Sequence, residues 1–461
     1  MVRLLFAALI GLASVFIARA AAADQLAHDT VSGAAIERVM LAPPGANAAE
    51  VAWADVSSAQ SPGLHVVRFN AKGEAVEIPH CNGRARVLVD NAVKDPGSRG
   101  PLVLKLGSDA DAAHDIRLEI NVSTYEKRIA CSHAPRVGAI VRSSEGLSHF
   151  KFTSTHSGPM AGEAVVFVPG GHDRTKAGAL LVGAHPWNTG PWTYAAYKEL
   201  LEEAGAKDVV LLMPSGLGNS LYTADAEDEV MKAIDAIGAE IAIDKQRVSI
   251  WGASMGGAGA TTISFHRPDR FAFASSYFGD SKYDLTTYVK SLLPNDATAK
   301  KVNALDVLEN ARHLPVWLIH GEDDHTSSIA QSVMLNDAMK KAGFKVDFDR
   351  VAGMGHEGPL VVKFIKRVVD RAADAKAPVF PARVSFRSVR GIDTQAYGVR
   401  IVRAGEADAF VDVEKRDDGV HVLRADNILQ IVLRAGALGA AENEKVIVDA
   451  PGSTVAVRWG Q

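Results

Sequence analysis

The sequence predicts an α/β protein with a doubly wound, mostly parallel sheet, flanked by a small N-terminal β domain and a C-terminal β-sandwich domain. Two observations predict this fold class. Between about residues 155 and 377, continuous apolar runs alternate with amphipathic helical stretches, which is typical of a parallel sheet covered on both faces. On either side, the apolar runs are short, often alternate with polar residues and are separated by turn residues, which is typical of antiparallel β domains.

Length, composition and charge set broad limits on function. The chain has 461 residues, of which 47% are hydrophobic and 23% charged, so it is long enough for two or three domains with sizeable cores. Its formal net charge is −4 at pH 7. Because no basic excess is present to hold a phosphate backbone, we expect no nucleic-acid partner.

Residues 1–23 have the pattern of a secretory signal peptide. Arg3 precedes an uncharged apolar run that ends at Ile17, and small residues follow. This pattern predicts cleavage after Ala20 or Ala23. The alternative, a membrane anchor, needs about 20 apolar residues. We therefore expect a secreted or periplasmic protein with no membrane partner after cleavage; the sequence leaves its oligomeric state open.

Residues 24–150 predict the small β domain, which shows no recognisable chemistry. Short apolar runs separated by turn residues lie at 66–69, 85–89, 102–106 and 116–120. The only two cysteines of the chain, Cys81 and Cys131, also lie here. In an oxidising compartment such a pair is expected to form a disulfide, with two buried free thiols as the alternative.

The middle segment, residues 155–377, predicts the doubly wound sheet. Its expected elements, in chain order, are a strand at 179–182, a helix near 194–203, a strand at 209–212, a helix over 226–241, a strand at 248–251, a helix after 254, strands at 271–274, 316–319 and 346–348, and a helix through 361–369.

After residue 377, Pro378 and Pro381 indicate a linker, since closely spaced prolines neither continue a helix nor pair in a central strand. Residues 379–461 then contain about seven short strand-like stretches, many of period two, and an Asp-Asp-Gly turn. This pattern predicts the C-terminal β-sandwich.

The strongest local motif is Gly252-Ala253-Ser254-Met255-Gly256. A serine hydroxyl acts as a nucleophile when a sharp strand-to-helix turn projects it toward a base, and glycines allow the backbone to pass close to itself there. The bare motif is weak evidence in a chain with 40 glycines. Its position between an apolar strand and a helix rich in small residues makes it specific and predicts Ser254 as the nucleophile.

A general base and an acid follow in the chain. His356 lies in a glycine-containing loop after the strand that ends near Val351 and before the last helix, so we expect it to be the base. The acid must orient the imidazole and stabilise its protonated form. Asp324 fits the spacing after the strand that ends at Ile319 best, with Asp323 as the alternative.

The same loop offers one other interpretation. His320, Asp323, Asp324 and His325 are all potential metal ligands. No further ligand motif accompanies them, and His320 is expected to be buried at the end of the strand, so we expect neither a metal nor any other cofactor.

Two backbone N–H groups must also face the oxygen that becomes negative during the reaction. Met255, directly after the nucleophile, is expected to supply one of them. The other is expected from the loop after Ala184, where Pro186 has no N–H, which leaves Trp187 or Asn188. We favour Trp187.

With these motifs in place, the middle segment resembles the α/β-hydrolase superfamily. More narrowly, it is similar to the prolyl-oligopeptidase-related esterase branch, which includes feruloyl-esterase-like and polyhydroxybutyrate-depolymerase-like enzymes. The likeness rests on residues 213–222, 226–229 and 251–257. It implies a serine hydrolase whose triad is Ser254, Asp324 and His356. His185-Pro186 departs from the His-Gly of many relatives, which leaves the second oxyanion donor open.

The expected activity is hydrolysis of a carboxylic ester through an acyl-enzyme. Prolyl oligopeptidases gate their site with a repeat-built propeller, whereas residues 24–150 show no internal repeat. We therefore favour an esterase acting on an acylated polysaccharide or polyester. A peptidase of the same family and a binding protein on a hydrolase fold remain the alternatives.

Aromatic residues in loops after strands are candidates for substrate contact, or else pack on the edges of the sheet. They are Trp187, Trp192, Tyr194, Tyr222 and Tyr283. The segment 281–312, between two strands, is long enough to form a small lid over the site.

Overall fold

The computed structural model describes residues 28–32, 35–42, 63–73, 75–78, 84–98, 102–107, 109, 112–122, 136–142, 146–157, 160–285, 293, 302–452 and 454–460. The chain divides into two compact units, residues 1–151 and 152–461. The signal-peptide prediction for residues 1–23 and the predicted disulfide between Cys81 and Cys131 lie outside the described residues. Among the residues described, no helix is both long and apolar enough to cross a membrane.

The first unit contains β strands only, as far as it is described. One sheet has the order β3-β8-β5-β6 and is antiparallel throughout; in the other, β1 pairs with β10 in parallel. The strands are β1 (His28–Ser32), β2 (Ala35–Ala42), β3 (Gly63–Lys72), β4 (Ala75–Ile78), β5 (Arg84–Val89), β6 (Ala92–Ser98), β7 (Leu102–Lys105), β8 (Ala113–Val122), β9 (Arg136–Arg142) and β10 (Gly146–Lys151).

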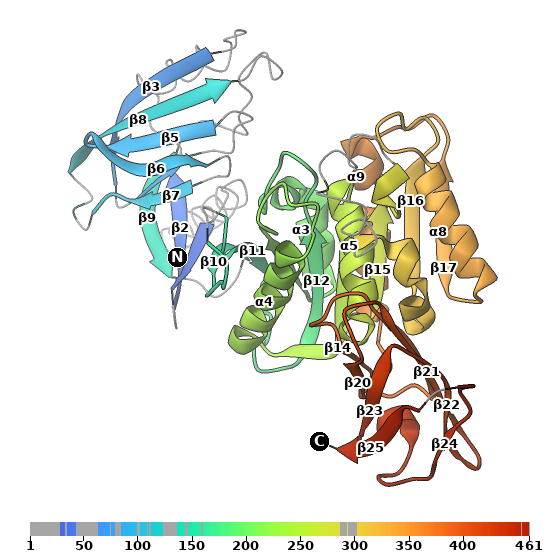
Figure 1. Ribbon diagram of the computed structural model, residues 1–461. Helices are drawn as coiled ribbons and strands as arrows, with labels where there is room; N and C mark the ends of the chain where they lie inside the picture. Colours follow the sequence, from blue (N-terminus) through green and yellow to red (C-terminus); the bar gives the residue numbers. More distant parts are fainter. Residues whose placement is uncertain are drawn as a thin grey trace, which may run out of the picture. The chain divides into compact units, whose positions relative to one another are not determined.

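The second unit begins with the doubly wound sheet, coloured green to orange in Figure 1. Its strands follow the order β17-β16-β15-β14-β12-β13-β11, and all neighbours are parallel except β11, which is antiparallel to β13. They are β11 (Glu163–Val168), β12 (Gly178–Ala184), β13 (Val209–Pro214), β14 (Ile243–Ala253), β15 (Phe273–Tyr277), β16 (Val316–Gly321) and β17 (Val346–Val351). Every residue of β13, β15 and β16 is buried, as expected for strands covered on both faces.

Helices cover both faces of this sheet. Two of them, α3 and α9, pack against each other. Helix α5 packs on β12, β14 and β15, and it also contacts the 3-10 segment η4. The elements are η1 (Tyr194–Ala196), α3 (Lys198–Ala206), α4 (Asp225–Glu240), α5 (Met255–His266), η2 (Pro268–Arg270), η3 (Tyr283–Leu285), η4 (Ala304–His313), α8 (Ala330–Lys341) and α9 (Gly358–Asp374). Most of these elements were predicted from the sequence, whereas β11, α8, η2, η3 and η4 were not.

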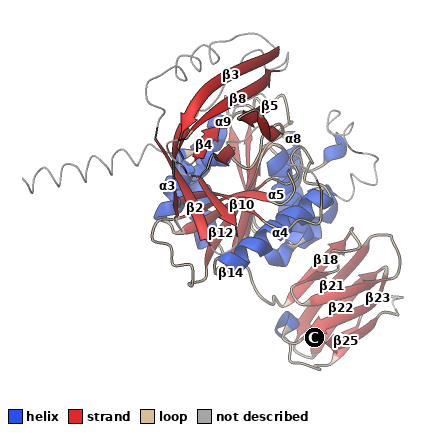
Figure 2. Ribbon diagram, turned by 90° about the vertical axis from the view of Figure 1, so that its left-hand side faces the viewer, coloured by secondary structure: helices blue, strands red, loops and turns tan. Residues whose placement is uncertain are grey.

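Residues after 379 form two four-stranded sheets, whose strands lie at the lower right of Figure 2. Their orders are β18-β21-β22-β24 and β19-β20-β23-β25, and the two sheets share one buried hydrophobic core. The strands are β18 (Arg383–Ser388), β19 (Gln395–Ala396), β20 (Val399–Arg403), β21 (Ala409–Arg416), β22 (Gly419–Asp426), β23 (Ile428–Arg434), β24 (Val446–Val448) and β25 (Ala456–Gly460). Two pairs, β22–β24 and β23–β25, are parallel, which the period-two pattern alone does not reveal.

Candidate active site

Ser254 lies at the turn between β14 and α5, in a conformation that few side chains adopt. Its φ is +58° and its ψ −122°, a strained backbone region that is held only when the surroundings fix it. A Cβ on Gly252 would collide with the carbonyl oxygen of Gly256, and a Cβ on Gly256 would collide with that of Ala184. The glycines of the motif are therefore needed for the close backbone approach that projects the serine hydroxyl.

His356 and Asp324 complete a continuous chain of hydrogen bonds to this hydroxyl. His356 Nε2 lies 2.8 Å from Ser254 Oγ, and His356 Nδ1 lies 2.8 Å from Asp324 Oδ2. With the Nδ1 proton directed at the carboxylate, Nε2 is left to accept the serine proton. The structure thus brings together the three residues predicted as the triad, each from the loop after a different parallel strand.

Asp324 is held as an anion by several donors. Its Oδ1 accepts hydrogen bonds from the N–H groups of Thr326 and Ser327, each at 2.8 Å, and His320 Nε2 lies 3.3 Å from its Oδ2. Burial alone would raise the pKa of Asp324, but hydrogen bonds from His320, His356 and the Ser327 N–H outweigh burial and hold it well below its usual value. Asp324 therefore stays ionised at neutral pH.

The alternatives within the same loop are not supported by the geometry. Asp323, the alternative acid, is exposed, as is His325. Both ring nitrogens of His320 have partners, Ser332 Oγ at 2.8 Å and the carbonyl oxygen of Ser327 at 2.9 Å. Of the four potential ligands, His320 and Asp324 lie together, whereas Asp323 and His325 are exposed. Among the described residues, the four do not bring three ligand-type atoms to one point.

Ser254 and His356 open into a cavity of about 440 Å³, a typical size for a small-molecule site. The described residues that line it are mainly aromatic, aliphatic or hydroxyl-bearing, include the acidic Asp280 and Glu357, and include no lysine or arginine. They are Pro186, Trp187, Thr189, Thr193, Tyr194, Tyr197, Leu221, Ala253, Ser254, Met255, Ala258, Phe278, Asp280, Tyr283, Thr326, Ser327, His356, Glu357, Gly358 and Val361.

The predicted substrate contacts divide into two groups. Trp187, Tyr194 and Tyr283 line the cavity, whereas Trp192 and Tyr222 do not. Tyr222 is fully buried, and its hydroxyl accepts a hydrogen bond from the His185 N–H at 2.8 Å. The prediction that Tyr222 and Trp192 contact substrate is therefore not supported by their positions, because position in a loop does not tell whether an aromatic ring faces the cavity or the core.

The candidate oxyanion donors come from two segments, the start of α5 and the loop after β12. Met255 is the first residue of α5, so its N–H has no acceptor within the helix. Trp187 lines the cavity. The Asn188 N–H donates to Asn219 Oδ1 at 2.6 Å. Because this N–H already has an acceptor, Asn188 is no longer a candidate for the second oxyanion donor. Trp187 stays the predicted second donor.

Phe278 is a site residue that the sequence analysis did not find. Its ring centroid lies 4.4 Å from that of His356, it lines the cavity, and its φ is +39°. Phe278 follows directly on β15, so a search of every loop after a parallel strand would have found it. The predicted lid, 281–312, is only partly described, and of its described residues Tyr283 lines the cavity.

One comparison with known proteins agrees with this architecture. Residues 218–373 match the prolyl oligopeptidase family, a stretch that contains all three triad candidates. The middle segment is an α/β-hydrolase domain. This match confirms the resemblance to the α/β-hydrolase superfamily that was inferred from the motifs.

Among solved structures, the hydrolase domain is similar to FphF, a fluorophosphonate-binding serine hydrolase of Staphylococcus aureus, with 17% identity, 48% of this chain and 96% of that chain covered, and a TM-score of 0.40. It is also similar to the acylaminoacyl peptidase of Pyrococcus horikoshii, with 18% identity, 51% and 42% covered, and a TM-score of 0.42. For a ferulic acid esterase the values are 16% identity, 46% and 91% covered, and 0.40. None of these likenesses assigns a substrate. No curated protein sequence matches this chain.

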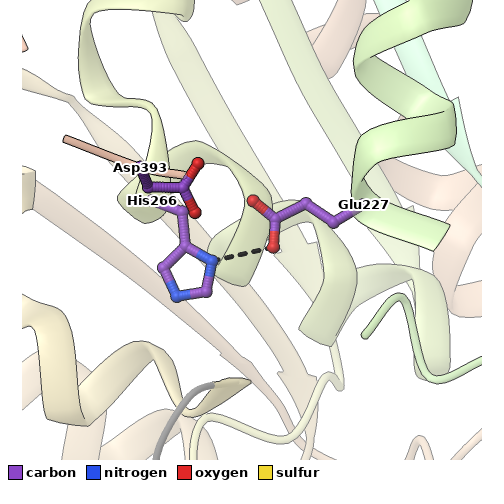
Figure 3. Close-up of side chains that lie close together, drawn as sticks. All are labelled: Glu227, His266 and Asp393. Carbon is purple, nitrogen blue, oxygen red and sulfur yellow. Dashed lines mark hydrogen bonds and ion pairs between the residues drawn. The ribbon is translucent and has the colours of Figure 1, made fainter. Parts of the chain in front are cut away.

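A second cluster of ionisable side chains lies away from the cavity, where the hydrolase domain meets the C-terminal β region. Glu227, His266 and Asp393 bring ligand-type atoms within 4.8 Å of one another, as Figure 3 shows. Arg267 pairs with Glu227 and, at 3.0 Å, with Asp393; Arg390 pairs with the other oxygen of Glu227 at 2.9 Å. Because two guanidinium groups already neutralise these carboxylates, the cluster is an ion-pair network rather than a metal site.

Proposed function

We propose that the chain is a serine esterase that cleaves carboxylic esters through an acyl-enzyme on Ser254. The observation that carries this proposal is the unbroken chain from Asp324 through His356 to Ser254, whose hydroxyl opens into a mainly apolar cavity. An oriented imidazole beside a projecting serine is the arrangement that nucleophilic acyl transfer requires.

In the proposed mechanism, Ser254 Oγ attacks the ester carbonyl carbon while His356 Nε2 takes its proton. The carbonyl oxygen becomes negative in the tetrahedral intermediate and is met by the Met255 N–H and a second donor, for which Trp187 is proposed. His356 then gives its proton to the leaving alcohol. A water molecule, activated by the same imidazole, attacks the acyl-enzyme and releases the acid.

The lining of the cavity favours a neutral acyl group. A volume of about 440 Å³ accommodates a small or aromatic acyl group but not a polymer. The absence of lysine and arginine from its described lining, with Asp280 and Glu357 present, disfavours an acyl group that carries a carboxylate. A polymeric alcohol such as a polysaccharide or polyester chain would therefore lie outside the cavity, with its acyl group inside.

Peptide hydrolysis is the second candidate, because the family that matches residues 218–373 is a peptidase family. The same triad serves both reactions, so the distinction depends on the leaving group. We also propose, from the pattern of residues 1–23, that the enzyme is exported.

The proposal is tested by assaying the mature protein and Ser254→Ala side by side on p-nitrophenyl acetate, methyl ferulate and a proline-containing peptide nitroanilide. We expect turnover of at least one ester that the substitution abolishes, with no amide cleavage. Amide cleavage at a comparable rate would identify a peptidase. Inactivity on all three substrates, with no labelling of Ser254 by a fluorophosphonate, would identify a non-catalytic protein.

A further inference from the structure

The hydroxyl of a buried tyrosine lies between two backbone segments that flank the candidate active site. Tyr194 Oη donates to the carbonyl oxygen of Ala184 at 2.9 Å and accepts from the N–H of Ala253 at 2.9 Å. Ala184 is the last residue of β12, and Ala253 is the last residue of β14, directly before the nucleophile. One side-chain atom thus connects the ends of two strands.

These two strands pair in parallel as far as Ala184 and Gly252. Beyond that pair the hydroxyl of Tyr194 takes both Ala184 O and Ala253 N–H as partners. Buried backbone groups need hydrogen-bond partners. Removing the hydroxyl would leave the Ala184 carbonyl oxygen and the Ala253 N–H unsatisfied. No bond through the Tyr194 side chain would then fix the distance between these two groups.

The ring of Tyr194 is fixed in place by its surroundings. Its side chain is only 1% exposed, its ring centroid lies 4.3 Å from that of Trp251, and a Cβ on Gly183 would come within 3.0 Å of its Cδ2. Burial raises the pKa of Tyr194 well above its usual value. The hydroxyl therefore stays protonated, which makes it a fixed hydrogen-bonding group rather than an acid or base.

The loop that follows Ala184 is held at successive residues by other side chains. Tyr222 Oη accepts from the His185 N–H at 2.8 Å, Thr189 Oγ1 donates to the Pro186 carbonyl at 2.7 Å, and Asn219 accepts from the Asn188 N–H. A loop held in this way is pre-organised for the developing charge of a transition state. Tyr194 is the member of this set that also bonds to the nucleophile turn.

We propose that Tyr194 is a positioning residue for the reaction: its hydroxyl sets the spacing between the turn that carries Ser254 and Met255 and the loop that carries Trp187, so that nucleophile and oxyanion donors meet one tetrahedral centre. This inference rests on the proposed function. It assigns Tyr194 a role through backbone positions, beyond lining the cavity. Small displacements of such groups reduce the rate rather than the affinity for the ground state.

The test compares Tyr194→Phe with Tyr397→Phe. Tyr397 is a matched control because it is also buried and its hydroxyl donates to a backbone carbonyl, that of Pro268 at 2.8 Å, away from the cavity. For each protein we would measure kcat and KM on a p-nitrophenyl ester, the inhibition constant of a trifluoromethyl ketone that mimics the tetrahedral intermediate, and the melting temperature.

For Tyr194→Phe we expect kcat to fall by about 10- to 100-fold, with KM within about threefold of wild type, and the affinity for the trifluoromethyl ketone to fall in parallel. For Tyr397→Phe we expect a lowered melting temperature with unchanged kcat. If Tyr194→Phe does not fold, Tyr222→Phe, which releases the next residue of the same loop, must show the same selective loss of kcat.

Three results would overturn the inference: a kcat for Tyr194→Phe within about twofold of wild type, a loss that appears only in KM, or an equal loss of kcat in Tyr397→Phe. If Tyr194→Phe does not fold, an unchanged kcat in Tyr222→Phe would also overturn the inference. These results differ from failure of the proposed function itself, in which wild type neither turns over an ester nor reacts with a fluorophosphonate.

Discussion

Two histidines of this protein each face a buried carboxylate, and they have different surroundings. His356 Nδ1 lies 2.8 Å from Asp324, and its side chain is 18% exposed at the cavity. His266 Nδ1 lies 2.8 Å from Glu227, but its side chain is 1% exposed, and the same carboxylate is paired with Arg267 and Arg390. A histidine–carboxylate pair thus lies beside the Ser254 hydroxyl in one place and within a packed ion-pair network in the other.

Exposure of the histidine at a cavity and the absence, in the described part of the chain, of arginine counterions distinguish the candidate active site from the structural ion-pair network. Arg390 and Asp393 lie between β18 and β19, whereas Glu227 and Asp228 lie in the first turn of α4. The network therefore ties the C-terminal sheets to the hydrolase domain. Asp324, in contrast, is held by N–H groups and histidines and has no arginine partner among the described residues. We therefore expect changes at the first cluster to reduce catalysis and changes at the second to reduce stability.

The largest effect is expected for Ser254→Ala. Without the nucleophile, kcat should fall by at least about 10⁴-fold, and the melting temperature should stay close to that of wild type because a small side chain at the cavity is lost. Steady-state ester hydrolysis and a thermal melt measure both. Substantial residual turnover by the variant would assign the reaction to another nucleophile.

Asp324→Asn is expected to lower kcat by about 10³- to 10⁴-fold, since an amide favours the wrong tautomer of His356. The control is Asp323→Asn in the neighbouring position, which is exposed and should leave kcat unchanged. Comparing kcat of the two variants on one ester shows which aspartate acts as the acid. If Asp323→Asn were the more damaging change, the assignment of the acid would be wrong.

Glu227→Gln should affect stability instead. It leaves Arg267 and Arg390, whose side chains are only 16% and 11% exposed, beside a neutral amide. We expect this change to cost about 3 kcal/mol of unfolding free energy. Urea unfolding measures this loss, and kcat per folded molecule should be unchanged. A fall in kcat without any change in the urea midpoint would mean that the network acts on the active site.

The smallest effect is expected from pH at the C-terminal sheets. Hydrogen bonds to Asp449 and Asp418 raise the pKa of His421. Because the pKa is higher in the folded state, this contribution to stability is fully present below the unfolded value of about 6.5 and is lost as the pH rises through the folded value. Hydrogen exchange of β22 and β24 between pH 6 and 9 should show this loosening in wild type and not in His421→Gln.

Much of the candidate site could be predicted from the sequence because the motifs that indicate it are local. The strand, the glycines and the helix around Ser254 are contiguous, and His356 and Asp324 each directly follow a strand. The choice of Asp324 over Asp323 is decided by which carboxylate is buried against His356, which depends on how the loop folds.

The roles of the buried tyrosines could not be predicted. Tyr194 and Tyr222 look like other aromatic residues in loops, and only the three-dimensional distances from their hydroxyls to Ala253 and His185 reveal what they hold. The ion-pair network was missed for the same reason, since Glu227 and Asp393 are far apart in the sequence. The parallel strand pairs near the C-terminus likewise depend on long-range pairing rather than on period.

The most direct test of the central claim is to react the purified protein with a fluorophosphonate and map the adduct by peptide mass spectrometry. The account predicts one stoichiometric adduct on the peptide that contains Ser254, loss of ester hydrolysis in proportion to labelling, and no adduct in Ser254→Ala. An adduct on another serine that accounts for the loss of activity, or full ester hydrolysis with Ser254 modified, would contradict it.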